Sequence, residues 1–259
     1  MNVAMLTDPT FHAHAVQAMF AAAALTVVML TLLSAPYGRH VRAGWGPTFD
    51  PRIGWVVMES PSVLLWGALF YLTMPTASAP ALIFLGIWFF HYVYRAFIYP
   101  FRMRVKPGDR MPILVAAMAV AFNTLNAIVN APMASGGVQS WTNAWLIDPR
   151  FLVGIALFGL GTWINRQADA SLRALRKPGE TGYKIPTGGL YEWITCPNYF
   201  GECVAWTGWA IATWSTAGLG FAVYTAANLV PRALQNHAWY QSQFPDYPKS
   251  RRAILPWIL

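Results

Sequence analysis

Charged residues are scarce in this chain. They make up 11% of its 259 residues, whereas 56% of the residues are hydrophobic. A soluble domain carries roughly 25% charged residues, and a large core alone does not account for such a deficit. We therefore expect most of the surface to face lipid, and the sequence predicts an integral membrane protein.

Cysteines are rare in this chain, and nucleotide-binding glycine motifs are absent from its sequence. Cys196 and Cys203 are too few for a disulfide framework and lack zinc-ligand spacing, so we expect no metal site. Neither a GxGxxG nor a Walker sequence is present, which means that a nucleotide would need a site unlike the Rossmann type. Because the first twelve residues have no basic stretch, we expect no cleavable signal peptide.

Seven apolar runs are spaced along the chain, and they predict a single all-α membrane domain over residues 1–259. The longer runs can cross the hydrocarbon region, which is about 30 Å thick. Thirteen tryptophans and eleven tyrosines suit the aromatic belts at the two membrane interfaces. The predicted transmembrane helices are residues 13–35, 53–74, 81–99, 113–133, 151–165, 198–216 and 219–234.

The predicted loops alternate in their content of lysine and arginine. The first, third and fifth loops and the tail hold almost all of these residues, and the second, fourth and sixth loops hold only Arg150. The positive-inside rule then places the N-terminus outside and the C-terminus in the cytoplasm. The same distribution explains the net charge of +8 without a nucleic-acid partner.

Several polar side chains fall inside the predicted helices, where they are costly and are candidates for function. Glu59 lies in the second helix near Pro61, and Tyr92 and Arg95 share a face of the third. The fourth helix carries a stripe of amides at Asn123, Asn126 and Asn130. Hydrogen bonding between helices and lining of a polar cavity account for this stripe equally well.

A polar segment follows the fifth helix and leads to a helix start at Pro197. Asn198 and Glu202 share one face at that start, where the helix dipole favours anions. If the fifth helix continues into the cytoplasm, one of its faces carries Asn165, Asp169, Arg173 and Arg176. This face is consistent with a solvated helix end and with a site for the phosphates and ribose of a nucleotide. The residues are likewise consistent with two classes of protein, an enzyme and a transporter that uses Glu59.

Seven segments carry a resemblance to a known family: residues 37–40, 59–62, 91–99, 175–180, 185–190, 198–202 and 246–251. In order and spacing they resemble the steroid 5-alpha-reductase family (3-oxo-5-alpha-steroid 4-dehydrogenases), over most of the chain. The resemblance implies an NADPH-dependent oxidoreductase that reduces the C4–C5 double bond of 3-oxo-4-ene steroids, such as testosterone or progesterone, by hydride transfer to C5. It also implies seven membrane helices.

The resemblance further implies roles for individual residues. Glu59, protonated in its buried position, and Tyr92 would hold the 3-oxo group as two donors, and we expect Phe122, Asn126 and Trp206 to line the substrate pocket. The cofactor would contact Asn165, Asp169, Arg173, Arg176, Tyr183, Lys184, Asn198, Glu202, Arg232, Asn236 and Tyr240, with Arg39, Arg95 and Arg104 as further candidates.

Three positions depart from the family pattern. Asn236 stands where the family typically has histidine, Ala205 where it often has glutamate, and Lys184 where it has an arginine. Lysine still pairs with phosphate but gives up the bidentate contact.

Other functions remain open on this scaffold. They are reduction of another lipid (a sterol, a polyprenol or an enoyl thioester), methyl transfer from S-adenosylmethionine, and lipid transport without catalysis. The membrane methyltransferases typically have Arg-His-Pro where this chain has Thr195, Cys196 and Pro197. The implied partners are a small apolar steroid and membrane lipid, with no obligatory protein partner evident. The cofactor site would lie on the cytoplasmic side of a bacterial inner membrane or the endoplasmic reticulum.

Overall fold

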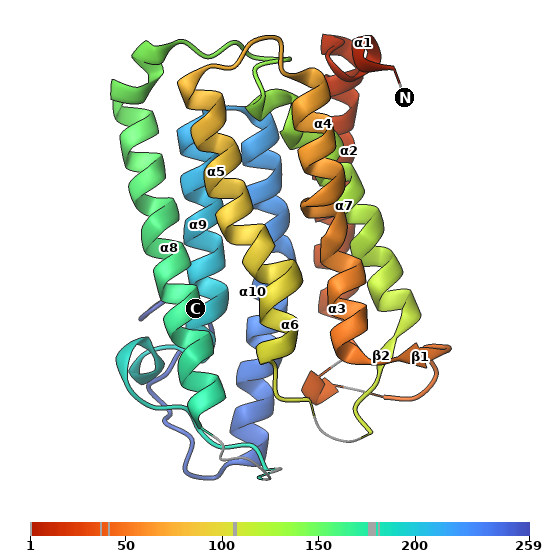
Figure 1. The fold of residues 1–259 in the computed structure, drawn as a ribbon. Coiled ribbons are helices and arrows are strands. Elements are labelled where there is room, and N and C mark those ends of the chain that lie inside the picture. The colour runs from red at the N-terminus through yellow and green to blue at the C-terminus, as the bar shows by residue number, and fades with distance from the viewer. Residues whose placement is uncertain (1, 37, 41, 106–107, 176–179, 181) are drawn as a thin grey trace.

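A computed structural model describes the chain except for residues 1, 37, 41, 106–107, 176–179 and 181. Its described residues form seven long helical segments that lie side by side in one bundle (Figure 1). These are α2 (Pro9–Leu32), α3 (Pro51–Glu59) continued by α4 (Leu64–Thr73), α5 (Ala79–Val93) continued by α6 (Tyr99–Arg102), α7 (Ile113–Ala134), α8 (Pro149–Ala174), α9 (Pro197–Thr213) and α10 (Thr216–Gln243).

Short elements connect these helices. At the lower end of the bundle in Figure 1, β1 (Thr48–Phe49) pairs antiparallel with β2 (Met111–Pro112). The remaining short pieces are α1 (Val3–Leu6), η1 (Gly38–His40), η2 (Ser60–Ser62), η3 (Tyr94–Ile98), η4 (Asn143–Ile147) and η5 (Gly189–Glu192). Of these, η2 joins α3 to α4, and η3 is a π-helical turn between α5 and α6.

Three of the long helices begin at an Asp-Pro pair. Asp8, Asp50 and Asp148 each precede a proline and accept a hydrogen bond from a backbone N–H in the first turn of α2, α3 and α8. The proline loses nothing there, because the first N–H groups of a helix have no partner within the helix. These pairs set the helix starts at residues 9, 51 and 149, two to four residues before the predicted ones.

Within the part of the chain that the structure describes, four helices are long and apolar enough to cross a membrane: Pro9–Leu32, Pro51–Thr73, Ala79–Arg102 and Ile113–Ala134. The predicted ends of two others are wrong. The fifth predicted helix, 151–165, continues to Ala174, and the seventh, 219–234, continues to Gln243. The apolar run stops earlier than the helix in both cases, because the residues of the last turns have polar side chains but still adopt the helical backbone.

Small residues let α8 and α9 approach until their backbones touch. Gly154 and Gly161 of α8 face Gly208 and Gly201 of α9, and a Cβ atom added at Gly201 would lie 2.5 Å from the backbone nitrogen of Asn165. Close approach of this kind is how helices pack in lipid, where no hydrophobic effect drives them together. It also brings the polar ends of α8 and α9 side by side.

We expect Gly161→Ala to lower the melting temperature in detergent, because its Cβ would collide with the backbone of Ala205 and Gly201, and overpacking typically costs about 1–3 kcal/mol. Gly159→Ala is the matched control on the same helix, since a Cβ there meets nothing within 4 Å. Equal melting temperatures for the two variants would contradict the close contact.

Candidate active site

Two buried carboxylates share one arginine at the centre of the bundle. Arg95 Nε lies 2.9 Å from Glu59 Oε1, and Arg95 Nη1 lies 3.1 Å from Glu202 Oε1. Glu59 and Glu202 are each only 6% exposed. The cluster therefore joins the end of α3 to the start of α9 through the π-helical turn η3.

The backbone around Arg95 is irregular, and neighbouring side chains fix it. A π-turn inserts extra backbone into an α-helix and is common at functional sites. Trp55 Nε1 donates to the carbonyl of Arg95 at 3.1 Å, and the guanidinium lies 5.3 Å from the centre of the same indole ring. Trp55 thus holds both the main chain and the side chain of Arg95.

Tyr92 and Trp206 form an aromatic wall beside this cluster. Tyr92 is 4% exposed, its ring centre lies 5.6 Å from that of Trp206, and it interacts electrostatically with Arg95. Trp206 Nε1 donates to Glu202 Oε2 at 3.0 Å. His91 Nε2, 3.7 Å from the same oxygen, makes no hydrogen bond among the described residues.

The amide stripe of α7 forms hydrogen bonds with neighbouring helices, which is the first of the two roles that the sequence left open. Asn123 Nδ2 donates to the carbonyl of Met58 at 2.6 Å and lies 3.5 Å from Glu59 Oε2. Asn130 also links helices, since it accepts from Trp209 Nε1 and donates to the carbonyl of Ala217. Asn126 is fully buried and accepts from Asn130.

A small polar cavity of about 10 Å³ lies beside the cluster, between the α5–α6 segment, α8 and the start of α9. Asn165 Nδ2 donates to the carbonyl of Asn198, and Asn198 Nδ2 donates to Asp169 Oδ1, both at 3.1 Å. The contact between α8 and α9 brings these residues together. The cavity is lined by His91, Tyr94, Arg95, Tyr99, Asn165, Arg166, Asp169 and Glu202.

Arg39 lies among three aromatic rings. Its guanidinium carbon is 5.3, 4.8 and 4.7 Å from the ring centres of Tyr183, Trp239 and Tyr240. Its Nη1 is buried without a hydrogen bond among the described residues. The three rings therefore hold the guanidinium in position, and its Nη1 can donate a further hydrogen bond.

Next to Arg39, His40 is held neutral. Burial, followed by the charges of Arg39, Arg232 and Arg42, lowers the pKa of His40, against the opposing effect of its hydrogen bond to Asn236. Its Nε2–H donates to Asn236 Oδ1 at 3.1 Å.

The structure places the other predicted site residues less centrally. Phe122 stacks on Tyr224 and reaches Trp206 only through Phe221. Arg232 donates to the hydroxyl of Tyr199, and Lys184 pairs with Glu180 at the surface. Arg173 is half-buried with its Nη1 unbonded among the described residues, Arg104 is exposed, and Arg176 lies outside the described residues.

The C-terminal tail forms part of the same region. Ile194 and Arg252 form a parallel bridge, and Arg251, 1% exposed, donates to the carbonyl of Pro186 at 2.9 Å. Thr195 Oγ1 accepts from His237 Nδ1 at 2.6 Å and from the Tyr247 hydroxyl at 2.8 Å, and burial lowers the pKa of His237. Sequence reasoning treated this tail only as a basic membrane-proximal segment, although residues 246–251 were among the resembling segments.

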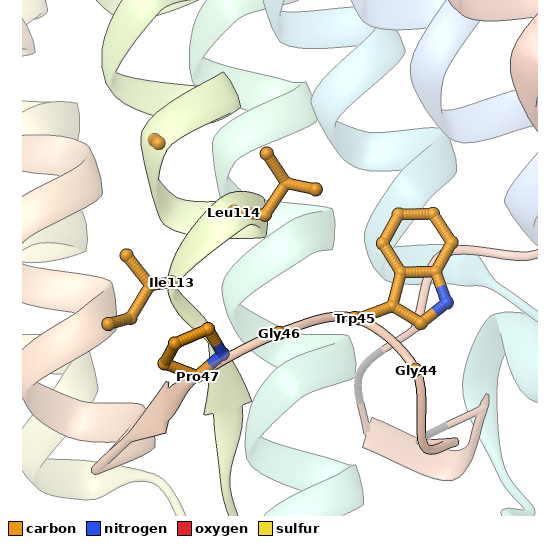
Figure 2. A pocket seen from close by; sticks show the side chains of 7 residues that line it. Gly44, Trp45, Gly46, Pro47, Ile113 and Leu114 are labelled. Atoms are coloured by element: carbon orange, nitrogen blue, oxygen red, sulfur yellow. The ribbon is translucent and has the colours of Figure 1, made fainter.

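A separate hollow of about 650 Å³ lies at the start of α7. Figure 2 shows the loop at 44–47 crossing beside α7, with the indole of Trp45 on one side and Ile113 and Leu114 on the other. Its lining carries no titratable side chain. Among the described residues, no group of three or more His, Cys, Asp or Glu could hold a metal ion.

Comparison with known proteins identifies the family to which this fold belongs. The family model for 3-oxo-5-alpha-steroid 4-dehydrogenase matches residues 109–259. The chain belongs to this family. The family predicted from the sequence is thereby confirmed, and the protein is an oxidoreductase that acts on CH–CH groups.

The family relationship extends over nearly the whole chain. Steroid 5-alpha-reductase DET2 of Gossypium hirsutum is 41% identical over 257 residues, which cover 98% of this chain and 100% of that protein. DET2 of Arabidopsis thaliana is 40% identical, covering 98% of both chains. The Homo sapiens 3-oxo-5-alpha-steroid 4-dehydrogenase 1 is 42% identical over 86% of this chain and 85% of its own.

We expect Thr195→Val to lower the melting temperature and to expose the tail to proteases. The valine leaves His237, Tyr247 and the Arg252 carbonyl without a shared partner, and an unsatisfied buried polar group costs about 1–3 kcal/mol. Thr195→Ser keeps the hydroxyl and is the control. Similar proteolysis of the tail in both variants would show that the hydroxyl does not hold it.

Proposed function

We propose that this protein reduces the C4–C5 double bond of 3-oxo-4-ene steroids, with NADPH as the hydride donor. The family supports steroid 4-ene reduction in general. The observation that carries the finer proposal is the burial of Glu59 and Tyr92 around Arg95, in contact with an aromatic wall and beside a polar cavity.

Glu59 and Tyr92 polarise the 3-oxo group. Hydride arrival at C5 drives negative charge onto the carbonyl oxygen, and two preorganised donors in a dry site stabilise that charge. Tyr92 donates through its hydroxyl, and Glu59 donates when it carries a proton. C4 then takes up a proton, so that one hydride and one proton are added across the double bond.

The apolar part of the steroid lies against aromatic side chains. Trp206 is 2% exposed and packs between Tyr92 and Phe221, with ring centres 5.6 and 4.4 Å away. Such a wall suits a flat hydrocarbon skeleton, and polar groups fix its 3-oxo end.

The polar side chains around this small cavity, together with Arg39, have the chemistry to hold a phosphorylated dinucleotide. Asp169, Asn198 and Glu202 offer oxygens and amides for sugar hydroxyls and a carboxamide, and the buried, unbonded Nη1 atoms of Arg39 and Arg173 offer donors for phosphate. When bound, NADPH supplies the hydride. The protein's residues orient it and exclude water.

We also propose seven membrane crossings, with the N-terminus outside and the C-terminus and cofactor site in the cytoplasm. Besides the four apolar spans, α8 and α10 have 26 and 28 residues, and a helix rises 1.5 Å per residue. The 17-residue α9 packs on both of them, and the alternation of basic loops supports the orientation.

Ligand-induced stabilisation tests the cofactor. We expect NADPH to raise the melting temperature of the purified protein, because ligands that bind the folded state stabilise it, and S-adenosylmethionine to leave it unchanged. We expect Arg39→Met to raise the KM for NADPH more than the KM for steroid. Arg42→Met is the matched control, since Arg42 bonds to Ser34 outside the cavity. A response to S-adenosylmethionine alone would overturn the reductase proposal.

Substitution of the two donors tests the carbonyl site. We expect Glu59→Ala and Tyr92→Phe each to lower kcat by about 10- to 1,000-fold, the scale of a lost oxyanion donor. Glu59→Gln should retain part of the activity, because its amide still donates. The assay follows NADPH oxidation with a panel of 3-oxo-4-ene steroids, polyprenols and enoyl thioesters. Wild-type turnover of testosterone by Glu59→Ala would refute the role of Glu59, and activity only on a polyprenol or thioester would redirect the substrate assignment.

A further inference from the structure

The charges around Arg95 do not balance when every group is ionised. Glu59 and Glu202 would carry two negative charges, and Arg95 carries one positive charge. Both carboxylates are buried, and burying an uncompensated charge is strongly unfavourable. One proton on the pair makes the cluster neutral, so the question is which carboxyl group holds it and on which oxygen.

The hydrogen bonds around Glu59 distinguish its two oxygens. Oε1 accepts from Arg95 Nε at 2.9 Å, and an oxygen that accepts from a guanidinium is the carbonyl-type oxygen of a carboxylic acid. Oε2 has only a long contact of 3.5 Å with Asn123 Nδ2, whose shorter bond of 2.6 Å goes to the Met58 carbonyl. Oε2 is thus the oxygen available to carry a proton.

Glu202 has the environment of an ionised carboxylate. Its Oε1 accepts from Arg95 Nη1 at 3.1 Å, and its Oε2 accepts from Trp206 Nε1 at 3.0 Å. Both oxygens therefore face donors, which favours the charged form, and the adjacent guanidinium supplies the opposite charge.

We propose that Arg95 is the positioning residue of the carbonyl site. It serves as the counter-ion of Glu202 and donates to Oε1 of Glu59, so that Glu59 remains a carboxylic acid with its proton on Oε2, directed at the 3-oxo group. The proposal rests on the proposed function, and it assigns to Arg95 a role other than the cofactor contact expected from the sequence.

Only an arginine fits this position. Its planar guanidinium presents Nε and Nη1 in fixed directions, one towards each carboxyl group, and it does not lose its proton. A lysine at the same place is a single point charge on a flexible stem. The titratable groups that face the cluster are Tyr92, Tyr99 and His91 from the α5–α6 segment and Arg166 and Asp169 from α8.

A double-mutant cycle tests the role. We expect Arg95→Met to lower kcat on steroid by about 10- to 100-fold, because the reacting donor is misplaced, with a smaller change in the KM for NADPH. In a Glu59→Ala background, where residue 59 offers no donor for Arg95 to position, the same change should cost less than about threefold. Equal fold-losses in the two backgrounds would overturn the proposal.

Two further variants separate positioning from folding. Arg95→Lys keeps the charge, and we expect it to keep the melting temperature and yet lose most of the kcat that Arg95→Met loses. Full activity of Arg95→Lys would argue against the proposal. Arg150→Met, in an exposed pair with Asp148, is the control and should behave as wild type.

The outcomes also distinguish this proposal from the proposed function. If Glu59→Ala is as active as wild type, the carbonyl role of Glu59 fails and Arg95 has nothing to position. If Glu59→Ala loses activity but the effects of Arg95→Met and Glu59→Ala multiply, the reductase proposal stands and only the positioning role fails.

Discussion

The ionic cluster of Arg95 with the buried carboxylates Glu59 and Glu202 constrains the rest of the structure. A carboxylate inside a membrane bundle is tolerated only when it is paired or protonated, and here one guanidinium serves two carboxylates from different helices. The three helical segments that carry them, α3, η3 and α9, must therefore meet at one point. The π-turn at Tyr94–Ile98 and the bond from Trp55 to the Arg95 carbonyl fix that meeting point.

The glycine contact between α8 and α9 determines the other half of the site. Without the close approach at Gly161 and Gly201, Asn165 and Asp169 could not bond to Asn198, which begins α9. The cluster and this contact share α9, because Glu202 lies one turn beyond Asn198. A single helix start thus connects the aromatic wall to the polar cavity, and a shift of α9 would disturb both.

The sequence predicted the bundle well where apolar periodicity governs the chain. It anticipated seven helical segments and the burial of Glu59 and Tyr92. It ended the helices of residues 149–174 and 216–243 too early, because hydropathy detects lipid contact and not the helical backbone. The Asp-Pro pairs at residues 8, 50 and 148 would have fixed three helix starts, since an aspartate cap followed by proline marks a helix start by itself.

Local sequence patterns could not predict the contacts between segments that are distant along the chain. Spacing alone put Tyr92 and Arg95 on one face, but it could not tell that Arg95 meets two carboxylates, because that depends on how α3, η3 and α9 cross. Arg39 was a marginal candidate until the three rings around it were visible. Arg251 looked like a solvated basic residue of the tail, yet it is almost completely buried. In each case the partner of the arginine is a carboxylate, a ring or a carbonyl that is far away in the sequence. The environment of the arginine therefore depends on how the bundle packs. The same residue type serves as the counter-ion of carboxylates at Arg95, as a donor stacked among rings at Arg39, and as an anchor of the tail at Arg251.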